Sequence, residues 1–268
     1  WFAKPNVSAL DESAVIRFLT GIIVRRGDIT AKEFRRIYQI VNNVLVYARF
    51  LELGGVRLFD WEMIRRYVPE GKMLPKLHKE FAVPRADIEK LLRLVVEENI
   101  YPRKRSASLC LVLNFFLGLR VGELASLTWQ DVDLSCRVVR IYKTETKAYN
   151  RDETGERCGP MVYQVVEDVK TFYSVREVPL LPEAVYILEE LREHHQQNGY
   201  KSQYLAYDGR DTILVRSLDR TLPKLCRYCD VKYFNTHKIR KTFATMLHEA
   251  KMPTRYISDI MGHSDMVT

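Results

Sequence analysis

The sequence predicts a mainly α-helical protein with one small antiparallel β-sheet, divided into a basic helical domain and a larger α+β domain. Three observations support this fold class. Apolar residues recur at helical spacing through most of the chain, and short β-branched segments occur between residues 137 and 178. A stretch rich in proline, glycine and lysine separates two unequal parts.

The first domain, residues 1–76, is predicted to contain three helices. Residues 11–25 carry apolar side chains close to one helical face, as an amphipathic helix requires. Thr30 is a predicted N-cap, and Glu33, three residues later, completes a capping box at the start of the second helix. Asp60 is positioned to cap a short third helix. The sequence therefore predicts that this domain is a small helical bundle.

The predicted linker spans residues 69–84, where three prolines and a glycine interrupt any regular element. The second domain, residues 82–268, then begins with an amphipathic helix at 87–98. The segment 106–119 is almost entirely apolar, so we expect it to be a helix buried in the core of this domain.

Three segments of the second domain, at 137–142, 161–166 and 174–178, alternate in polarity and are rich in β-branched residues, which predicts the strands of one antiparallel sheet. The polar stretch 146–160 contains two glycines and a proline and is predicted to be a long hairpin loop. Helical patterns complete the domain at 123–128, 182–195, 217–226, 236–250 and 253–261.

Composition excludes several classes of protein. The 268 residues are 47% hydrophobic, which is too high for a disordered chain, and 12 Gly with 10 Pro exclude a collagen-like or low-complexity one. The longest apolar run is far too short to span a bilayer. Five scattered cysteines are typical of a reducing, intracellular setting rather than of a disulfide scaffold, so we expect a cytoplasmic protein.

Charge permits a polyanionic partner. Lys and Arg number 42 against 34 Asp and Glu, a formal net charge of +8 with a pI near 9.2. Residues 1–81 hold 14 of these cations against 9 anions, a net charge of +5, so the first domain is the more basic per residue. A positive balance alone is weak evidence, because many basic proteins bind no nucleic acid.

The first segment that indicates chemistry is Gly118-Leu-Arg120-Val-Gly-Glu123-Leu, which follows the predicted core helix. An arginine at such a turn is held by a rigid core and can hold two oxygens of one phosphate with its planar fork. Glu123, one helical turn later, is placed to fix the guanidinium. An ordinary helix-cap arginine with a surface ion pair would give the same pattern.

The second and third segments are Thr236-His237-Lys-Ile-Arg240-Lys241 and Gly262-His263-Ser. His237 and Arg240 share one helix face, and with Thr236 as the predicted N-cap they lie in the first turn, where free backbone N–H groups favour an anion. A solvated basic face is the alternative for this pair. His263 follows a glycine at a helix end, a position that a surface histidine also occupies.

Taken in order, these motifs resemble the tyrosine recombinase (phage-type integrase) family, as in a phage or an integrative or conjugative mobile element. The resemblance covers residues 82–268 by motif and 1–80 more loosely. It implies a helical core-binding domain that binds DNA, followed by a tyrosine-recombinase catalytic domain with an α+β fold. Each motif alone is weak, and the combination is specific.

The resemblance also assigns catalytic roles, residue by residue. Glu123 is the acidic residue that supports the first active-site arginine. The catalytic lysine is assigned to Lys170, with Lys143 and Lys147 as alternatives on the preceding strand and its loop. The implied catalytic residues are Arg120, Lys170, His237, Arg240 and His263.

The implied activity is site-specific recombination of DNA through a 3′-phosphotyrosyl intermediate, with neither metal nor ATP. The charges of arginine and histidine suit a phosphodiester transition state. We therefore expect no cofactor and no metal, and the sequence holds no glycine-rich phosphate loop or acidic metal cluster. The resemblance further implies double-stranded DNA with a specific recombination site as partner, a homotetramer in the synaptic complex, an accessory excision factor, a prokaryotic host and no membrane.

The family's nucleophilic tyrosine is expected just beyond Thr268, where the printed sequence ends. As given, the chain is therefore expected to bind DNA without cleaving it in cis. Two alternatives remain open. One is a type IB topoisomerase or telomere resolvase, which shares the chemistry. The other is a non-catalytic DNA-binding relative that has lost its tyrosine.

Basic residues near the motifs and on the second predicted helix are candidates for DNA contacts. For each of them a solvated face, or a flank of a hydrophobic segment, is an alternative explanation. Cys226 and Cys229 lack a second pair at zinc-finger spacing, so we expect them to be structural. The DNA-binding candidates are Lys32, Arg35, Arg36, Arg103, Lys104, Arg105, Lys238 and Lys241.

Overall fold

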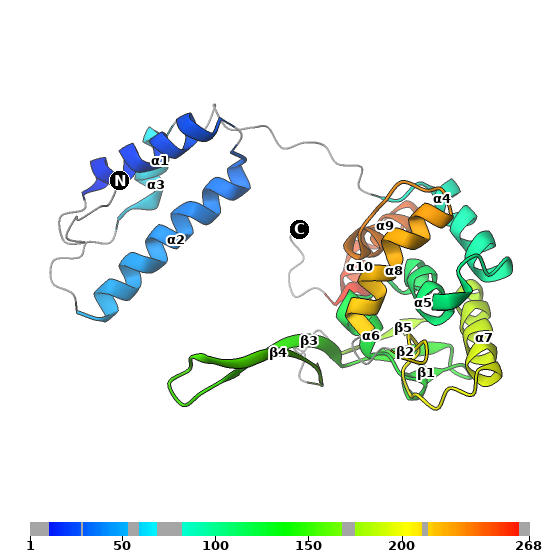
Figure 1. Cartoon of the computed structure of the whole chain (residues 1–268). Coiled ribbons are helices and arrows are strands. Elements are labelled where there is room, and N and C mark those ends of the chain that lie inside the picture. Colours follow the sequence, from blue (N-terminus) through cyan, green and yellow to red (C-terminus); the bar gives the residue numbers. More distant parts are fainter. Residues whose placement is uncertain are drawn as a thin grey trace. The chain divides into compact units, whose positions relative to one another are not determined.

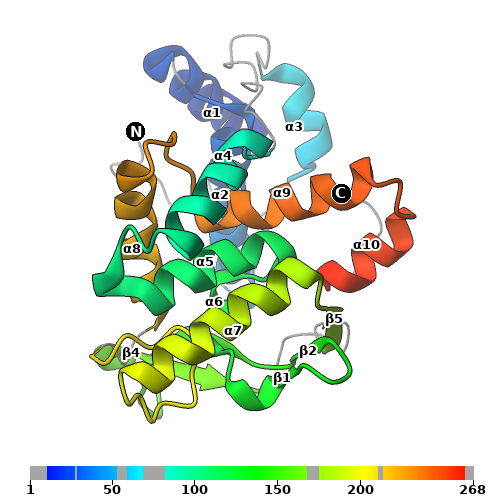
Figure 2. The ribbon, with the colours of Figure 1, turned by 90° about the vertical axis from the view of Figure 1, so that its right-hand side faces the viewer.

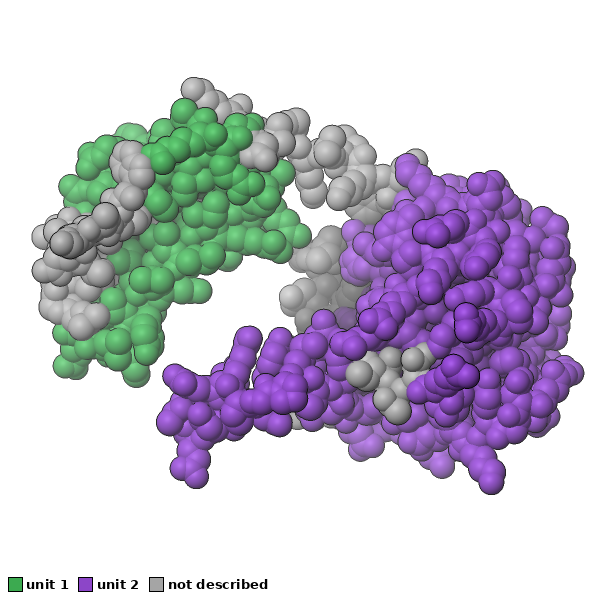
Figure 3. Space-filling view, viewed as in Figure 1, with its two compact units in different colours: residues 1–79 green, residues 80–268 purple. Residues whose placement is uncertain are grey.

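The computed structural model divides the chain into two compact units, residues 1–79 and 80–268 (Figure 3). Among the residues it describes, no helix is both long and apolar enough to cross a membrane. Most of the predicted linker, residues 69–81, lies outside the described part of the chain. The described residues are 11–27, 29–52, 59–68, 82–167, 175–210 and 214–262.

The first unit contains the three predicted helices, α1 (Glu12–Arg26), α2 (Ala31–Phe50) and α3 (Trp61–Tyr67) (Figure 1). The predicted capping box is confirmed, because the backbone N–H of Thr30 donates to Glu33 Oε2 over 3.0 Å while the Thr30 hydroxyl accepts from the Glu33 backbone. Asp60 caps α3 as expected. A shared core joins the helices through Leu19, Ile23, Phe34, Leu45 and Ile64.

The second unit is built around α5 (Arg105–Leu117), of which every residue is buried. Figure 2 shows α5 between α7 and α9, both of which contact it together with α8. The prediction of a buried core helix is confirmed. The remaining helices are α4 (Arg85–Leu91) continued by a π-helical turn (Leu92–Glu97), α6 (Val121–Ser126), α7 (Pro182–Gln197), α8 (Leu214–Tyr228), α9 (Thr236–Glu249) and α10 (Thr254–Met261), with 3₁₀ turns at Pro102–Lys104 and Trp129–Asp131.

The described residues of the second unit form two antiparallel sheets where one was predicted. The first has the order β1 (Val132–Asp133), β2 (Val138–Ile141), β5 (Arg176–Pro179). Buried Val139 of β2 pairs with buried Val178 of β5, which turns this sheet toward the core.

The second sheet is a hairpin of β3 (Thr144–Arg151) and β4 (Arg157–Val166). The prediction of a loop at 146–160 is therefore wrong. Most side chains of both strands are exposed, so the apolar alternation that marks a half-buried strand is weak here. Cross-strand pairs stabilise the hairpin instead, such as the Arg157 guanidinium over the Tyr149 ring at 4.1 Å.

A short turn connects α5 to α6 and fixes where α6 begins. Gly118 adopts φ +62°, in the left-handed region that ends many helices. The buried side-chain amide of Asn114 accepts from the backbone N–H of Leu119 at 2.7 Å and donates to its carbonyl at 3.1 Å. A Cβ on Gly118 would collide with the ring of Phe243 on α9. Backbone conformation and packing therefore both require glycine there.

Helix α9 begins one residue away from the prediction. The side chain of Asn235, not Thr236, is the N-cap, because its Oδ1 accepts the backbone N–H of Lys238 at 2.9 Å. Asn and Thr are both good N-cap residues. Asn235 is the cap here because an N-cap residue has an extended backbone, and the backbone of Asn235 is extended. His237 still lies in the first turn of α9.

Gly118→Ala is predicted to destabilise the second unit more than Gly199→Ala. Both glycines have nearly the same φ, +62° and +63°, but only Gly118 has an atom within reach of the added Cβ. The left-handed backbone costs about 1–2 kcal/mol in each variant. The clash with Phe243 adds about 1–3 kcal/mol in Gly118→Ala alone. Urea unfolding measures the difference, and equal midpoints for the two variants would contradict this account.

Candidate active site

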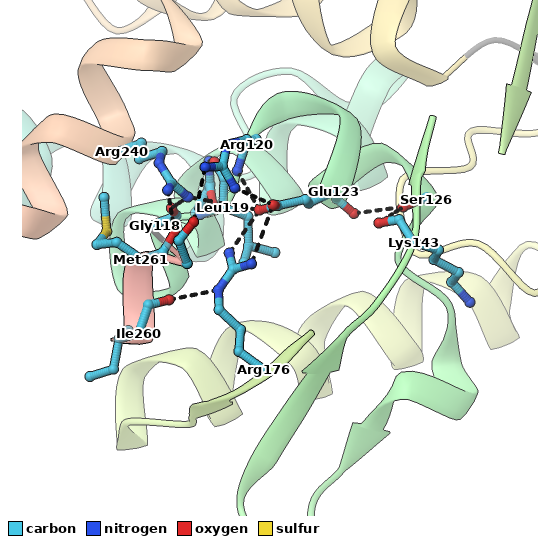
Figure 4. Close-up of polar contacts among 12 residues, drawn as sticks. Gly118, Leu119, Arg120, Glu123, Ser126, Lys143, Arg176, Arg240, Ile260 and Met261 are labelled. Carbon is cyan, nitrogen blue, oxygen red and sulfur yellow. Dashed lines mark hydrogen bonds and ion pairs between the residues drawn. The ribbon is translucent and has the colours of Figure 1, made fainter. Parts of the chain in front are cut away.

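A buried carboxylate, that of Glu123, is the centre of the site (Figure 4). It lies in the first turn of α6 and is 3% exposed. Its Oε2 accepts the backbone N–H of Arg120 at 2.9 Å, and its Oε1 accepts Arg120 Nη1 at 2.8 Å. Gly122 lets β3 pass close to α6, because a Cβ there would lie 2.6 Å from the carbonyl oxygen of Glu145.

Two further guanidiniums reach the same carboxylate. Arg176, at the start of β5, donates from Nη2 to Glu123 Oε2 at 2.8 Å and from Nη1 to Oε1 at 3.3 Å. Arg240 of α9 lies 3.8 Å from Oε2 through its Nη1. The side chains of Arg176 and Arg240 are 5% and 4% exposed, whereas that of Arg120 is 46% exposed. Arg120 is thus the arginine of the cluster that meets solvent.

The same three arginines hold the end of α10. Arg176 Nε donates to the Ile260 carbonyl at 2.7 Å, and Arg240 Nη2 donates to that of Met261. Arg120 Nη2 donates to the carbonyl of Gly262 at 3.2 Å. These three consecutive carbonyls lie at the negative end of the helix dipole, where cations are favourable.

Electrostatics keep the carboxylate of Glu123 ionised. Burial raises its pKa, but the hydrogen bonds and charge of Arg176, with the bonds from Arg120, outweigh burial and hold the pKa below the usual value of 4.5. Burial, then the charge of Arg120, lowers the pKa of Arg240 to about 9, which leaves it protonated at pH 7. Three cations around one anion give the cluster a net charge of +2.

His237 lies in the field of these cations. It is exposed in the first turn of α9. Burial, followed by the charges of Lys241, Arg240 and Arg120, lowers its pKa below 6.5. Its imidazole is therefore mainly neutral at pH 7, and a bound anion would favour its protonation.

The structure thus brings together Arg120, Glu123 and Arg240, with His237 in their field. Lys170 and His263 lie outside the described residues, so their assigned roles remain predictions. Gly262, which precedes His263, ends α10 in the left-handed conformation, as predicted.

The alternative lysines have other partners in this structure. Lys143 Nζ donates to Thr128 Oγ1 at 2.9 Å and forms an ion pair with Asp131 Oδ2 at 2.8 Å. Figure 4 shows its side chain pointing away from the three arginines. Burial works to lower its pKa, but Asp131 outweighs burial and raises it above the usual value. Lys147 of β3 lies over the Tyr163 ring of β4 at 5.8 Å.

Arg105 does not fit its predicted contact with DNA. Its side chain is 8% exposed and donates to the carbonyls of Val95 and Val96 and to Glu190 of α7. This guanidinium joins the π-helical turn, α5 and α7 inside the unit, and the structure does not support its predicted contact with DNA. Lys104, its neighbour, is half-buried, with Nζ 3.5 Å from the Ser217 hydroxyl. The remaining candidates are all exposed except half-buried Lys238: Lys32, Arg35, Arg36, Arg103, Lys238 and Lys241.

Sequence reasoning gave no role to Arg176. The sequence holds one signal for it. Arg176 lies two positions before Val178, so the two side chains lie on the same face of β5. Val178 is fully buried, so a charge on this face needs a buried partner, and Glu123 is that partner. Nothing in the strand pattern identifies Glu123, which is 53 residues away.

The part of the chain that the structure describes contains no group of three His, Cys, Asp or Glu side chains arranged to hold a metal ion. Cys226 and Cys229 are buried with free thiols. Burial raises the pKa of both, which makes them poor thiolate ligands or nucleophiles.

Residues 83–268 match the phage integrase family, and the chain belongs to that family. A tyrosine recombinase XerC-like protein of Caldanaerobacter subterraneus subsp. tengcongensis is 31% identical over 167 residues, which are 58% of this chain and 42% of that protein. Tyrosine recombinase XerA of Thermococcus kodakarensis is 25% identical over 239 residues, 87% of this chain and 68% of that protein. The match to the first relative thus spans less than half of its length.

Solved structures share the fold. The integrase of transposon Tn1549 in complex with transposon right end DNA superimposes with a TM-score of 0.67 and 18% identity, covering 98% of this chain and 80% of that one. A lambda integrase dimer bound to a core site superimposes with a TM-score of 0.56 and 12% identity, covering 98% of this chain and 83% of that one. At these identities the likeness concerns the fold alone.

The pKa of His237 is predicted to lie below 6.5 and to rise in Lys241→Ala and Arg120→Ala, since each variant removes a positive charge that disfavours the imidazolium. Arg140→Ala is the matched control, because Arg140 forms an exposed ion pair with Glu177 on the other strand of the β2–β5 pair. NMR titration of the imidazole measures these shifts. A pKa that is the same in all four proteins would show that His237 does not sense the cluster.

Proposed function

We propose that the protein is a tyrosine site-specific recombinase that integrates or excises a mobile element by cutting and rejoining DNA. One observation carries the proposal. In a chain of the phage integrase family, Arg120, Arg176 and Arg240 surround the buried carboxylate of Glu123, and Arg120 faces solvent. A site with surplus positive charge and an exposed guanidinium suits the non-bridging oxygens of a phosphodiester.

The proposed reaction needs no energy source, because each bond broken is replaced by a similar one. A tyrosine hydroxyl gives up its proton to solvent and attacks the phosphorus, a P–O bond to tyrosine forms, and the bond to the 5′-oxygen breaks. The 5′-oxygen takes a proton from a lysine, and the 5′-hydroxyl of another strand later reverses the step. We place the attacking tyrosine after Thr268 in the gene product.

Arg120 and Arg240 are proposed to bind the phosphate oxygens, with His237 and His263 as further donors. Lys170 is the proposed general acid. Lys143 becomes a candidate only if it leaves Asp131, since that ion pair both occupies its ammonium and raises its pKa.

Helix α8 supports the proposal that this unit binds DNA. Four exposed cations follow one another at intervals of four, four and three residues, which places them along one face of α8. Within the described residues none of the four has an ion-pair partner, so their charges are not neutralised by the protein. These residues are Arg216, Arg220, Lys224 and Arg227.

At the carboxyl end of α8 this row of four cations reaches an open pocket of about 440 Å³. Its wall includes Arg103, one of the predicted DNA-binding residues, together with Lys224 and Arg227. We therefore propose α8 and Arg103 as one continuous DNA-contacting surface. Lys32, Arg35, Arg36, Lys104, Lys238 and Lys241 remain proposed contacts.

The proposed substrate is double-stranded DNA with a specific recombination site, and the proposed working unit is a homotetramer on two such sites. The solved relatives support DNA as the substrate, since the Tn1549 integrase is bound to transposon right end DNA and the lambda integrase is a dimer bound to a core site. We propose that the protein works in the cytoplasm of a prokaryotic host.

The full gene product, incubated with DNA that spans the ends of its own element, is predicted to form a covalent adduct. The adduct should form in EDTA, survive SDS and disappear with protease. Arg120→Ala should reduce its yield by about 100-fold or more, as removal of one transition-state donor does. Arg140→Ala is the control and should leave the yield unchanged.

Tight, salt-sensitive binding without any adduct would instead indicate the non-catalytic DNA-binding relative. Relaxation of supercoiled plasmids without site preference would indicate a topoisomerase.

Arg220→Gln combined with Lys224→Gln is predicted to weaken DNA binding and to make it less dependent on salt. Removing one cation that binds a phosphate should reduce the slope of log K against log[salt] by about 1, so the double variant should reduce it by about 2. Arg140→Gln should keep the original slope. Titrations by fluorescence anisotropy at several salt concentrations measure it, and an unchanged slope would remove α8 from the DNA interface.

A further inference from the structure

Arg176 is the member of the arginine cluster for which DNA chemistry gives no direct role. All three of its guanidinium nitrogens donate within the protein, Nε to the Ile260 carbonyl and both Nη atoms to Glu123, so its partners are internal. It comes from β5, a different element from the α5–α6 turn and α9 that supply Arg120 and Arg240. Its contacts with Glu123 and α10 indicate what it does.

The first contact fixes the carboxylate. An ionised carboxylate accepts about four hydrogen bonds. Arg176 supplies two of them, one to each oxygen of Glu123, and the backbone and Nη1 of Arg120 supply the others. Because the guanidinium fork is planar and rigid, the bidentate pair sets the plane of the carboxylate. The plane of the carboxylate in turn sets the position from which Arg120 can donate to Glu123.

The second contact fixes the end of α10. Arg176 Nε donates to the Ile260 carbonyl at 2.7 Å. Gly262 packs directly on the guanidinium, since a Cβ there would lie 3.0 Å from Arg176 Nη1. Arg176 therefore joins β5, α6 and the last turn of α10 through one side chain.

We infer that Arg176 is a positioning residue that keeps Arg120 turned toward the DNA, an inference that rests on the proposed function. With both oxygens of Glu123 shared, Arg120 can use only Nη1 on this carboxylate, and its Nη2 bonds the nearby Gly262 carbonyl. Without Arg176, each oxygen loses one donor. The nearest guanidinium able to fill both places is that of Arg120, which would then turn its fork inward.

Loss of Arg176 also changes the charge of the cluster. The net charge falls from +2 to +1, because the carboxylate of Glu123 is then shared by two cations instead of three. The inward turn of Arg120 and the lost charge should both weaken binding of the phosphate in the transition state. General DNA binding should weaken less, because it depends on many surface contacts.

The test compares Arg176→Met and Arg176→Lys with Arg140→Met in the full gene product. At saturating DNA, Arg176→Met should form the covalent adduct about 100-fold more slowly, as a small misplacement of a catalytic group does. The dissociation constant for DNA should change by no more than about threefold, which is within the effect of one surface ion pair. Arg176→Lys keeps the charge but not the fork, and should restore part of the rate. Arg140→Met should match the wild type.

A double-mutant cycle with Glu123→Gln identifies the route of the effect. If Arg176 acts through Glu123, the double variant should be no slower than the slower single variant. Multiplying effects, or rates for both Arg176 variants equal to that of the wild type, would overturn the inference. Should Arg176→Met fail to fold, Arg176→Lys carries the test with an expected loss of about 10-fold.

A crystal structure of Arg176→Lys decides the matter even if the wild-type protein forms no adduct, an outcome that would refute the proposed function alone. Arg120 should bond both oxygens of Glu123 with its two Nη atoms and release the Gly262 carbonyl. An Arg120 that keeps its wild-type contacts would overturn the inference.

Discussion

The buried carboxylate of Glu123, shared by three guanidiniums, is the interaction on which the site depends. A single anion cannot neutralise three cations, so the cluster keeps a surplus of positive charge next to an exposed Arg120. Unpaired, the buried charge of Glu123, Arg176 or Arg240 would be costly. Together they form a preformed cluster of surplus positive charge, which is the arrangement that the proposed electrostatic catalysis requires.

The fold brings four elements to this one carboxylate. Helix α6 supplies Glu123, and the Gly118 turn after the buried α5 sets where α6 begins. Strand β5 supplies Arg176, α9 supplies Arg240, and the last carbonyls of α10 accept from the same arginines. Because each element contributes a charge or a dipole to the cluster, displacement of any one of them alters the field at Arg120.

Local signals in the sequence predicted much of this. Helix caps such as Thr30 follow from neighbouring residues, and the motif arginines were found because each lies beside its own helix start. The β3–β4 hairpin was missed because both of its faces are exposed and carry little apolar alternation. The ion pairs of Arg105 and Arg176 were not predicted, for one reason. Their partners Glu190 and Glu123 are 85 and 53 residues away, and sequence pattern does not reveal pairs formed only by the tertiary fold.

The central claim is that Arg120 and Arg240, organised by Glu123, hold the phosphate that is cut. A crystal structure of the full gene product on its recombination site, with the scissile phosphate intact, tests it most directly. We predict that the two guanidiniums and His237 lie within hydrogen-bond distance of one phosphate group, while Glu123 still bonds Arg176. A phosphate held elsewhere, or a Glu123 turned away from the arginines, would contradict the account.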